Sequence, residues 1–229
     1  MTGMKCFGYY LVKPMPTPNW CTIKSKNILS ISESDLSYKF PDLTKCFWAN
    51  YPQSDRDEYA KYLGLSSLEF SDLCKNVSNL FNENRLAVDA SFSSLADALM
   101  LSTYIRKAHG YRLVGLYTDN RLFSKYEEEG YFKFNKAGDN INGGKRIGCE
   151  ILGSNGDGFD SYIINSLNEI LDKSVDLIID NQTGLILNTY EEARHFSDMI
   201  QGMGEPVIWR PFELYEYEVH DSKFNLSGR

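Results

Sequence analysis

The sequence predicts an α+β fold, in which a mixed or antiparallel sheet packs with several helices in one domain spanning residues 1–229. Segments rich in aromatic and β-branched residues, typical of strands, are mixed with segments whose apolar residues recur every three or four positions, typical of helices. The two kinds of segment lack the regular strand–helix–strand order of a doubly wound parallel sheet, and no internal repeat is present. The Gly- and Asn-rich loop 135–146 is where a two-lobed arrangement would divide this domain.

Strands are predicted where aromatic and branched side chains dominate. Residues 5–13 form the first such run, and the prolines at 14, 16 and 18 end it because proline cannot donate a backbone hydrogen bond. Residues 28–31 and 86–90 are shorter candidates. The remaining predicted strands are 111–117, 147–152 and 206–218.

Helices are predicted from apolar stripes and from residues that cap helix ends. The clearest stripe lies in 67–81 and consists of Leu68, Phe70, Leu73, Cys74, Val77, Leu80 and Phe81. Gly64 and Gly110 are typical of helix ends, and Ser93 or Ser94 is typical of an N-cap. The other predicted helices begin at Ser54 or span 95–108, 120–129, 160–171 and 189–201. Asp157 or Asp160 would lie at the start of 160–171, where the helix dipole favours an acid.

Composition and charge exclude some classes of function. The chain has 229 residues, with 24 Lys and Arg against 31 Asp and Glu, and a formal net charge of −7. Nucleic-acid binding requires clustered basic residues, so this balance argues against it and favours a cationic partner. The hydrophobic content of 42% is that of a globular chain.

The cysteine pattern predicts a cytoplasmic protein with reduced thiols. The five cysteines, at 6, 21, 46, 74 and 149, are odd in number and form no CxxC pair, whereas a secreted disulfide framework is normally even and denser. The prolines at 14–18 interrupt the N-terminal segment before it reaches the length of a signal-peptide core. No apolar run has the length of a membrane helix, so we expect no membrane partner.

Motifs for chemistry are absent, and we predict no catalytic residue, cofactor or metal. Near Lys145 the glycines are out of register with a phosphate-binding loop, and Arg146 replaces the required hydroxyl. The turn 153–160 carries the side-chain oxygens of Asn155, Asp157 and Asp160 but not the order of ligands that a calcium loop requires. The sequence lacks Gly-x-Ser-x-Gly, and no histidine has a neighbour that marks it as a base. The alternative is a small hydrolase whose active site combines residues 153–160 with His195.

The C-terminal third carries a family resemblance. The residues that carry it are Gly148–Gly153, Gly158–Ser161, Asn165–Leu167, Gly184–Ile186, Tyr190–Ala193, Glu205–Pro211 and Glu216–Tyr217. Over about 147–218, this pattern resembles bacterial polymorphic-toxin immunity proteins. Its motifs consist of shape-keeping residues rather than a reactive set. In that pattern a His and a Cys often follow the Phe of the Gly-Phe segment, whereas this chain has Asp160 and Ile164 near those places.

The resemblance implies an immunity protein that binds a cognate secreted toxin in the cytoplasm and occludes its active site, without catalysis. Many such toxins attack nucleic acids and are cationic, so we expect a basic toxin, of which a nuclease is one kind, as the partner. Acidic side chains would then steer the encounter and aromatic rings would anchor the complex. Three acidic–aromatic clusters are the candidate partner-binding residues: Tyr126, Glu127, Glu128, Glu129 and Tyr131; Asp157, Phe159 and Asp160; and Glu213, Tyr215, Glu216 and Tyr217. In the third cluster, strand alternation predicts that Glu216 lies on the face opposite the other three.

Overall fold

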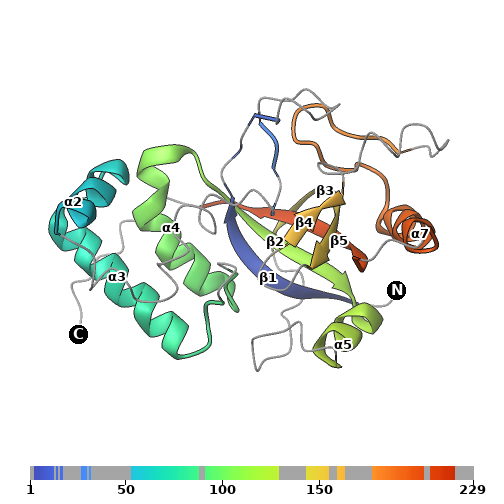
Figure 1. The fold of residues 1–229 in the computed structure, drawn as a ribbon, viewed down its shortest axis with the longest axis horizontal. Helices are drawn as coiled ribbons and strands as arrows, with labels where there is room; N and C mark the ends of the chain where they lie inside the picture. Colours follow the sequence, from blue (N-terminus) through green and yellow to red (C-terminus); the bar gives the residue numbers. More distant parts are fainter. Residues whose placement is uncertain are drawn as a thin grey trace.

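The fold is described from a computed structural model of the chain (Figure 1). The structure describes residues 3–12, 14, 16–17, 27–29, 31, 53–87, 91–128, 143–154, 159–162, 177–203 and 207–219. Residues 135–142 of the predicted loop 135–146 and residues 163–171 of the predicted helix 160–171 lie outside these ranges, as do Cys21 and Cys46.

The described strands form one antiparallel sheet, which confirms the predicted α+β class. The strands are β1 (Met4–Val12), β2 (Arg112–Asp119), β3 (Lys145–Ser154), β4 (Phe159–Ser161) and β5 (Trp209–Tyr217). Their order across the sheet is β1-β2-β5-β3-β4, and each neighbouring pair is antiparallel. The last strand in the sequence therefore lies at the centre of the sheet, between β2 and β3 (Figure 1).

Five helices accompany the sheet in the described part of the chain: α2 (Gln53–Tyr62), α3 (Ser67–Asn82), α4 (Leu95–His109), α5 (Asn120–Glu128) and α7 (Tyr190–Gln201). Figure 1 shows α2, α3 and α4 together at one end of the molecule and α7 beside β3 and β5 at the other. The short helix α5 follows β2 directly. None of the described helices combines the length and the apolar character needed to cross a membrane.

The core divides into three clusters because successive residues of each strand point to opposite faces. Tyr9 and Leu113 point into the first cluster, with the apolar stripe of α3. Phe212 and Leu214 point into the second, on the opposite face, with Leu29. The third cluster lies between α7 and the far end of the sheet, and it consists of Cys149, Ile151, Tyr162, Ile186, Ala193, Phe196, Ile200 and Trp209.

Tyrosines pack closely across the first cluster because β2 has a glycine at its centre. A Cβ atom on Gly115 would lie 2.9 Å from the ring of Tyr117 and 3.0 Å from that of Tyr217. The hydroxyl of Tyr117 is hydrogen-bonded to that of Tyr217 and lies 3.3 Å from that of Tyr9. A buried chain of three hydroxyl groups therefore crosses β1, β2 and β5.

Local capping fixes the helix ends much as the sequence predicts. Ser66 and Glu69 form a capping box at α3, and Thr189 and Glu192 form another at α7. Ser94 caps α4, whose C-cap is Gly110 in the left-handed region at φ +67°. Within α3 the predicted stripe is buried at Phe70, Leu73, Val77 and Leu80. The prediction that Leu68 belongs to this stripe is wrong, since its side chain is 73% exposed in the first turn of α3.

Two local predictions are wrong for a tertiary reason. Lys145 and Arg146, predicted as loop, already belong to β3, where they pair with Glu216 and Tyr215. Asp160, predicted at a helix start, instead lies in β4 opposite Gly153. In both places the pairing partner supplies the backbone hydrogen bonds that the local sequence does not indicate.

Candidate functional site

Two of the three predicted acidic–aromatic clusters lie at the margin of the described structure. Tyr126, Glu127 and Glu128 belong to the last turn of α5, whereas Glu129 and Tyr131 lie outside the described residues. Phe159 and Asp160 are in β4, the strand at one edge of the sheet, and Asp157 lies outside the described residues. The structure does not bring these two clusters into a described contact.

The third cluster lies on the central strand β5, and its acids form ion pairs within the fold. Glu216 binds Arg112 of β2 through two hydrogen bonds of 2.6 Å, from Nε and Nη2 to Oε1 and Oε2. Glu213 accepts a hydrogen bond from Nε of Arg146 and another from the hydroxyl of Tyr215, at 3.0 Å. Tyr217 is only 6% exposed. As predicted, Glu216 lies on the face opposite the other three.

These contacts account for the third cluster as a structural network at the centre of the sheet. Arg146 also donates to the backbone carbonyl of Asn188, 2.6 Å away, and so joins β3 and β5 to the segment before α7. Burial, followed by the charge of Glu213, raises the pKa of Tyr215 to about 12. Whether any of the three clusters also binds a partner stays a prediction.

A pocket opens where β2 separates from β5. The described pairing of the two strands ends at Tyr117↔Glu213, whereas β5 continues back to Trp209 beside β3. In that stretch, α7 replaces β2: Ser197 donates to the carbonyl of Trp209 at 2.8 Å, and Gln201 accepts from its N–H at 3.1 Å. Backbone N–H groups alternate in direction along a strand, so the nitrogen of Pro211 faces the α7 side, as that of Trp209 does. No neighbouring strand needs an N–H there, which explains how a central strand tolerates a proline.

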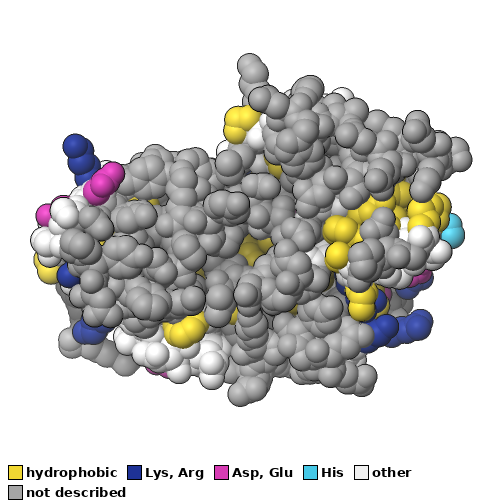
Figure 2. All heavy atoms as spheres, in the orientation of Figure 1, with side chains coloured by type: hydrophobic (Ala, Val, Ile, Leu, Met, Phe, Trp, Pro, Cys, Tyr) yellow, Lys and Arg dark blue, Asp and Glu magenta, His cyan; other side chains and the backbone are white. Residues whose placement is uncertain are grey.

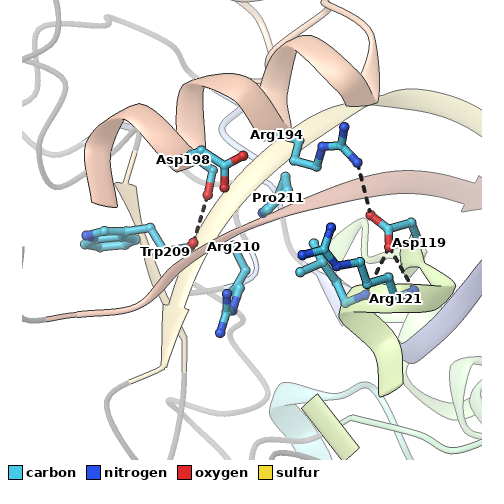
Figure 3. Close-up of a pocket in the computed structure, with 9 residues that line it drawn as sticks. Asp119, Arg121, Arg194, Asp198, Trp209, Arg210 and Pro211 are labelled. Atoms are coloured by element: carbon cyan, nitrogen blue, oxygen red, sulfur yellow. Dashed lines mark hydrogen bonds and ion pairs between the residues drawn. The ribbon is translucent and has the colours of Figure 1, made fainter. Parts of the chain in front are cut away.

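The pocket has a volume of about 190 Å³ and a polar wall (Figure 3). Its lining comes from α7, from the start of β5 and from the junction of β2 with α5: Asp119, Arg121, Leu122, Arg194, Ser197, Asp198, Trp209, Arg210 and Pro211. Figure 3 shows Arg194 reaching from α7 towards Asp119, with Arg121 beside them. Three arginines thus belong to the lining of one pocket in a chain whose net charge is −7.

Asp119 is the organising residue of this wall. One carboxylate oxygen, Oδ1, accepts hydrogen bonds from the backbone N–H groups of Arg121 and Leu122, at 2.9 and 3.0 Å, and so caps α5. The other, Oδ2, accepts from the hydroxyl of Tyr190 at 3.1 Å and lies 3.9 Å from Nη1 of Arg194. Its charge is therefore largely engaged by the helix start and by Tyr190.

The hydroxyl of Tyr190 is saturated with partners. Besides donating to Asp119, it lies 2.9 Å from the hydroxyl of Thr118 and accepts from the N–H of Asp119 at 3.2 Å. Burial, followed by hydrogen bonds that act in the opposite sense, leaves the pKa of Tyr190 raised above its ordinary value. Tyr190 therefore ties the start of α7 to the end of β2 as a neutral group.

Sequence reasoning did not identify this pocket, because its lining comes from three segments that are distant in the sequence. Of this lining, only the run Trp209–Pro211 belonged to a motif that the resemblance singled out. A proline inside an otherwise clear strand pattern was the one signal of an unpaired strand edge. Nothing local in the sequence pointed to Arg121 or Asp119.

The residues of the alternative hydrolase site do not meet in the described structure. His195 is an exposed residue of α7, and residues 155–158 lie outside the described ranges. Cys149 is fully buried, and burial raises the pKa of its thiol to about 12, so it is a weak nucleophile. Within the described residues, Cys6, Cys74 and Cys149 form no disulfide. Within the described ranges, no three His, Cys, Asp or Glu side chains are grouped as metal ligands.

The chain was also compared with known proteins. No protein-family model matches it, and no curated protein or solved structure matches it either.

Proposed function

We propose that this chain is an immunity protein, which binds a cognate secreted bacterial toxin in the cytoplasm of the producing cell and occludes the active site of that toxin. It acts by binding and needs no cofactor. The partner is a basic toxin domain, as expected for a nuclease.

The observation that carries this proposal is that the motifs of the family resemblance contact one another. Gly153 and Trp209 come from two motifs, and a Cβ on Gly153 would lie 2.9 Å from the Trp209 ring. Cys149 and Ile186 come from two others, and their backbones exchange hydrogen bonds of 2.7 and 2.9 Å. Ala193, from a further motif, packs in the same core cluster. The resemblance therefore concerns a packed unit, whose motif residues keep its shape.

The surface around this unit also suits protein binding. Four large apolar side chains in segments next to the third core cluster are exposed, at 61%, 45%, 45% and 39%: Ile178, Leu187, Met203 and Ile208. Figure 2 shows hydrophobic side chains gathered on the part of the surface where α7 lies in Figure 1. Ile178 and Leu187 are adjacent, since the N–H of Leu187 donates to the carbonyl of Ile178 at 2.7 Å. Grouped exposed apolar side chains of this kind commonly mark a binding surface.

The first test is a growth-rescue assay with the reading frame next to the gene for this chain. Expression of that neighbour alone should stop growth. Co-expression of this chain should restore growth, and the chain should co-purify with the toxin. If the chain neither restores growth nor binds the toxin, the proposal is wrong.

The electrostatic part is tested by charge reversal. The double variant Glu127→Lys/Glu128→Lys should slow association with the toxin at low salt, because acidic groups steer a basic partner. The matched control is Glu58→Lys/Asp72→Lys, with the same change in net charge on exposed positions of α2 and α3. Equal association rates for the two variants would show that the acids of α5 do not steer the toxin.

The apolar part is tested through the dissociation rate. Ile178→Ser/Leu187→Ser should speed dissociation of the complex, since most effects of interface mutations fall on that rate. Leu68→Ser is the control, because Leu68 is 73% exposed on α3, at the other end of the molecule. Dissociation that is unchanged in the double variant would place the interface elsewhere.

A further inference from the structure

Two arginines of the pocket, Arg121 and Arg194, differ from three arginines elsewhere in the described structure in how their charge is balanced. Arg85, Arg112 and Arg146 each form a close ion pair, with Asp97, Glu216 and Glu213 respectively. In the pocket, by contrast, the described carboxylate paired with Arg194 is 3.9 Å away. Arg121 has no ion pair among the described residues, and its backbone N–H is what binds Asp119. Two guanidinium groups therefore keep donors available for another anion.

The two acids that line the pocket oppose a bound anion only in part. Asp119 is only 6% exposed, and its oxygens already bind the start of α5 and the hydroxyl of Tyr190. Asp198 is exposed on α7, where it is the one lining carboxylate that would oppose a bound anion. Arg121 and Arg194 thus share the pocket with two carboxylates, one of which is engaged within the protein.

The size of the pocket and the positions of its arginines indicate which class of anion would fit. The volume of about 190 Å³ is below the range of about 300–1,000 Å³ typical of larger ligands. Arg121 and Arg194 come from two separate elements, α5 and α7, so their guanidinium groups approach from different parts of the fold (Figure 3). A tetrahedral phosphoryl group offers oxygens in several directions, and arginine is the side chain best suited to bind it.

We propose that this pocket binds the phosphoryl group of a small ligand, either inorganic phosphate or a small phosphate monoester, through Arg121 and Arg194. Arg210 also lines the pocket, but Figure 3 shows its side chain directed away from Arg121 and Arg194. This inference is independent of toxin binding, since it concerns a different set of residues and a different ligand.

The test is calorimetric titration of the full chain with inorganic phosphate and, separately, with glycerol phosphate as the monoester. Acetate serves as the carboxylate comparison. Saturable one-to-one binding of a phosphoryl probe, tighter than that of acetate and weakened by added salt, is expected. Preference for one probe over the other tells which source fits better. Absence of saturable binding by both phosphoryl probes would overturn the proposal.

Two sets of pocket variants are expected to change phosphate affinity in opposite directions, so a misfolded variant cannot produce the whole expected pattern. Arg121→Gln/Arg194→Gln should weaken phosphate binding by at least about tenfold, because it removes two charge-assisted contacts. Lys61→Gln/Lys75→Gln, which removes the same charge from exposed positions of α2 and α3, should bind as the original chain does. Asp198→Asn should tighten binding, since it removes the opposing charge. Unchanged binding in both pocket variants, with thermal unfolding showing them folded, would refute the assignment.

Discussion

The hydroxyl of Tyr190 and the carboxylate of Asp119 hold α7 against the end of β2, 3.1 Å apart and each only 6% exposed. Asp119 is at the same time the cap of α5. One buried pair therefore fixes two helices relative to the sheet.

Removing that hydroxyl should destabilise the fold. Tyr190→Phe leaves a buried carboxylate without one of its donors, and a lost hydrogen bond to a charged group costs about 1.5–3 kcal/mol. Urea unfolding should show this loss in the free energy of unfolding. Tyr104→Phe is the control, because the hydroxyl of Tyr104 makes a long contact of 3.5 Å with Asn76 on α3. Equal losses in the two variants would contradict a special role for the Tyr190–Asp119 pair.

A methyl group at Gly153 should also destabilise the fold, through overpacking. The added Cβ would clash first with the side chain of Val207 and would lie 2.9 Å from the ring of Trp209. Trp209 is 6% exposed and packs against Tyr162 at a ring separation of 4.8 Å. Gly153→Ala should cost about 1–3 kcal/mol, the usual effect of forcing atoms into a packed core. The measurement is again the free energy of unfolding.

The control for Gly153 is the same substitution where space is available. At Gly202, after α7, φ is −66° and the contacts of an added Cβ begin at 3.4 Å. Gly202→Ala should stabilise by a few tenths of a kcal/mol up to about 1 kcal/mol, because it restricts the unfolded chain. A destabilisation at Gly202 as large as that at Gly153 would mean that the close packing against Val207 and Trp209 is not the cause.

Local patterns predicted most of the elements of this fold. The capping box of α7 needs only Thr189 and Glu192, three residues apart, and the alternation of β5 can be read from its own residues. What could not be predicted depends on residues that meet only after folding. Phe159–Ser161 is a strand because β3 pairs with it, and Lys145 is in a strand because β5 does.

The pocket shows the same limit for functional residues. Asp119 and Tyr190 are separated by 71 positions, and nothing local to either residue indicates their contact. The acidic–aromatic run of β5 was visible in the sequence, but the partners of its acids, Arg112 and Arg146, belong to the two flanking strands. The sheet order that brings them together was not predicted from any local pattern.

Buried tyrosines predict how the stability of the protein depends on alkaline pH. Burial is the largest cause that raises the pKa values of Tyr9, Tyr117 and Tyr190 above the ordinary value near 10. Below pH 10 these hydroxyls are protonated in the folded and the unfolded chain, so they add no pH dependence. Above about pH 10 the unfolded chain loses protons that the folded chain keeps. Stability should then fall by about 1.4 kcal/mol per pH unit for each hydroxyl.

Removing the hydroxyl of Tyr9, which belongs to the buried hydroxyl chain, tests how much of this pH dependence of stability comes from one tyrosine. Tyr9→Phe removes one titrating group, so its free energy of unfolding should fall less steeply with pH above 10, by about 1.4 kcal/mol per pH unit. Phe92→Leu, in the same core cluster, should lower stability at every pH but keep the full slope, since it removes no hydroxyl. Urea titrations of both variants between neutral and alkaline pH measure the two slopes. Identical slopes in Tyr9→Phe and the original chain would show that the Tyr9 hydroxyl ionises equally easily in the folded and the unfolded states.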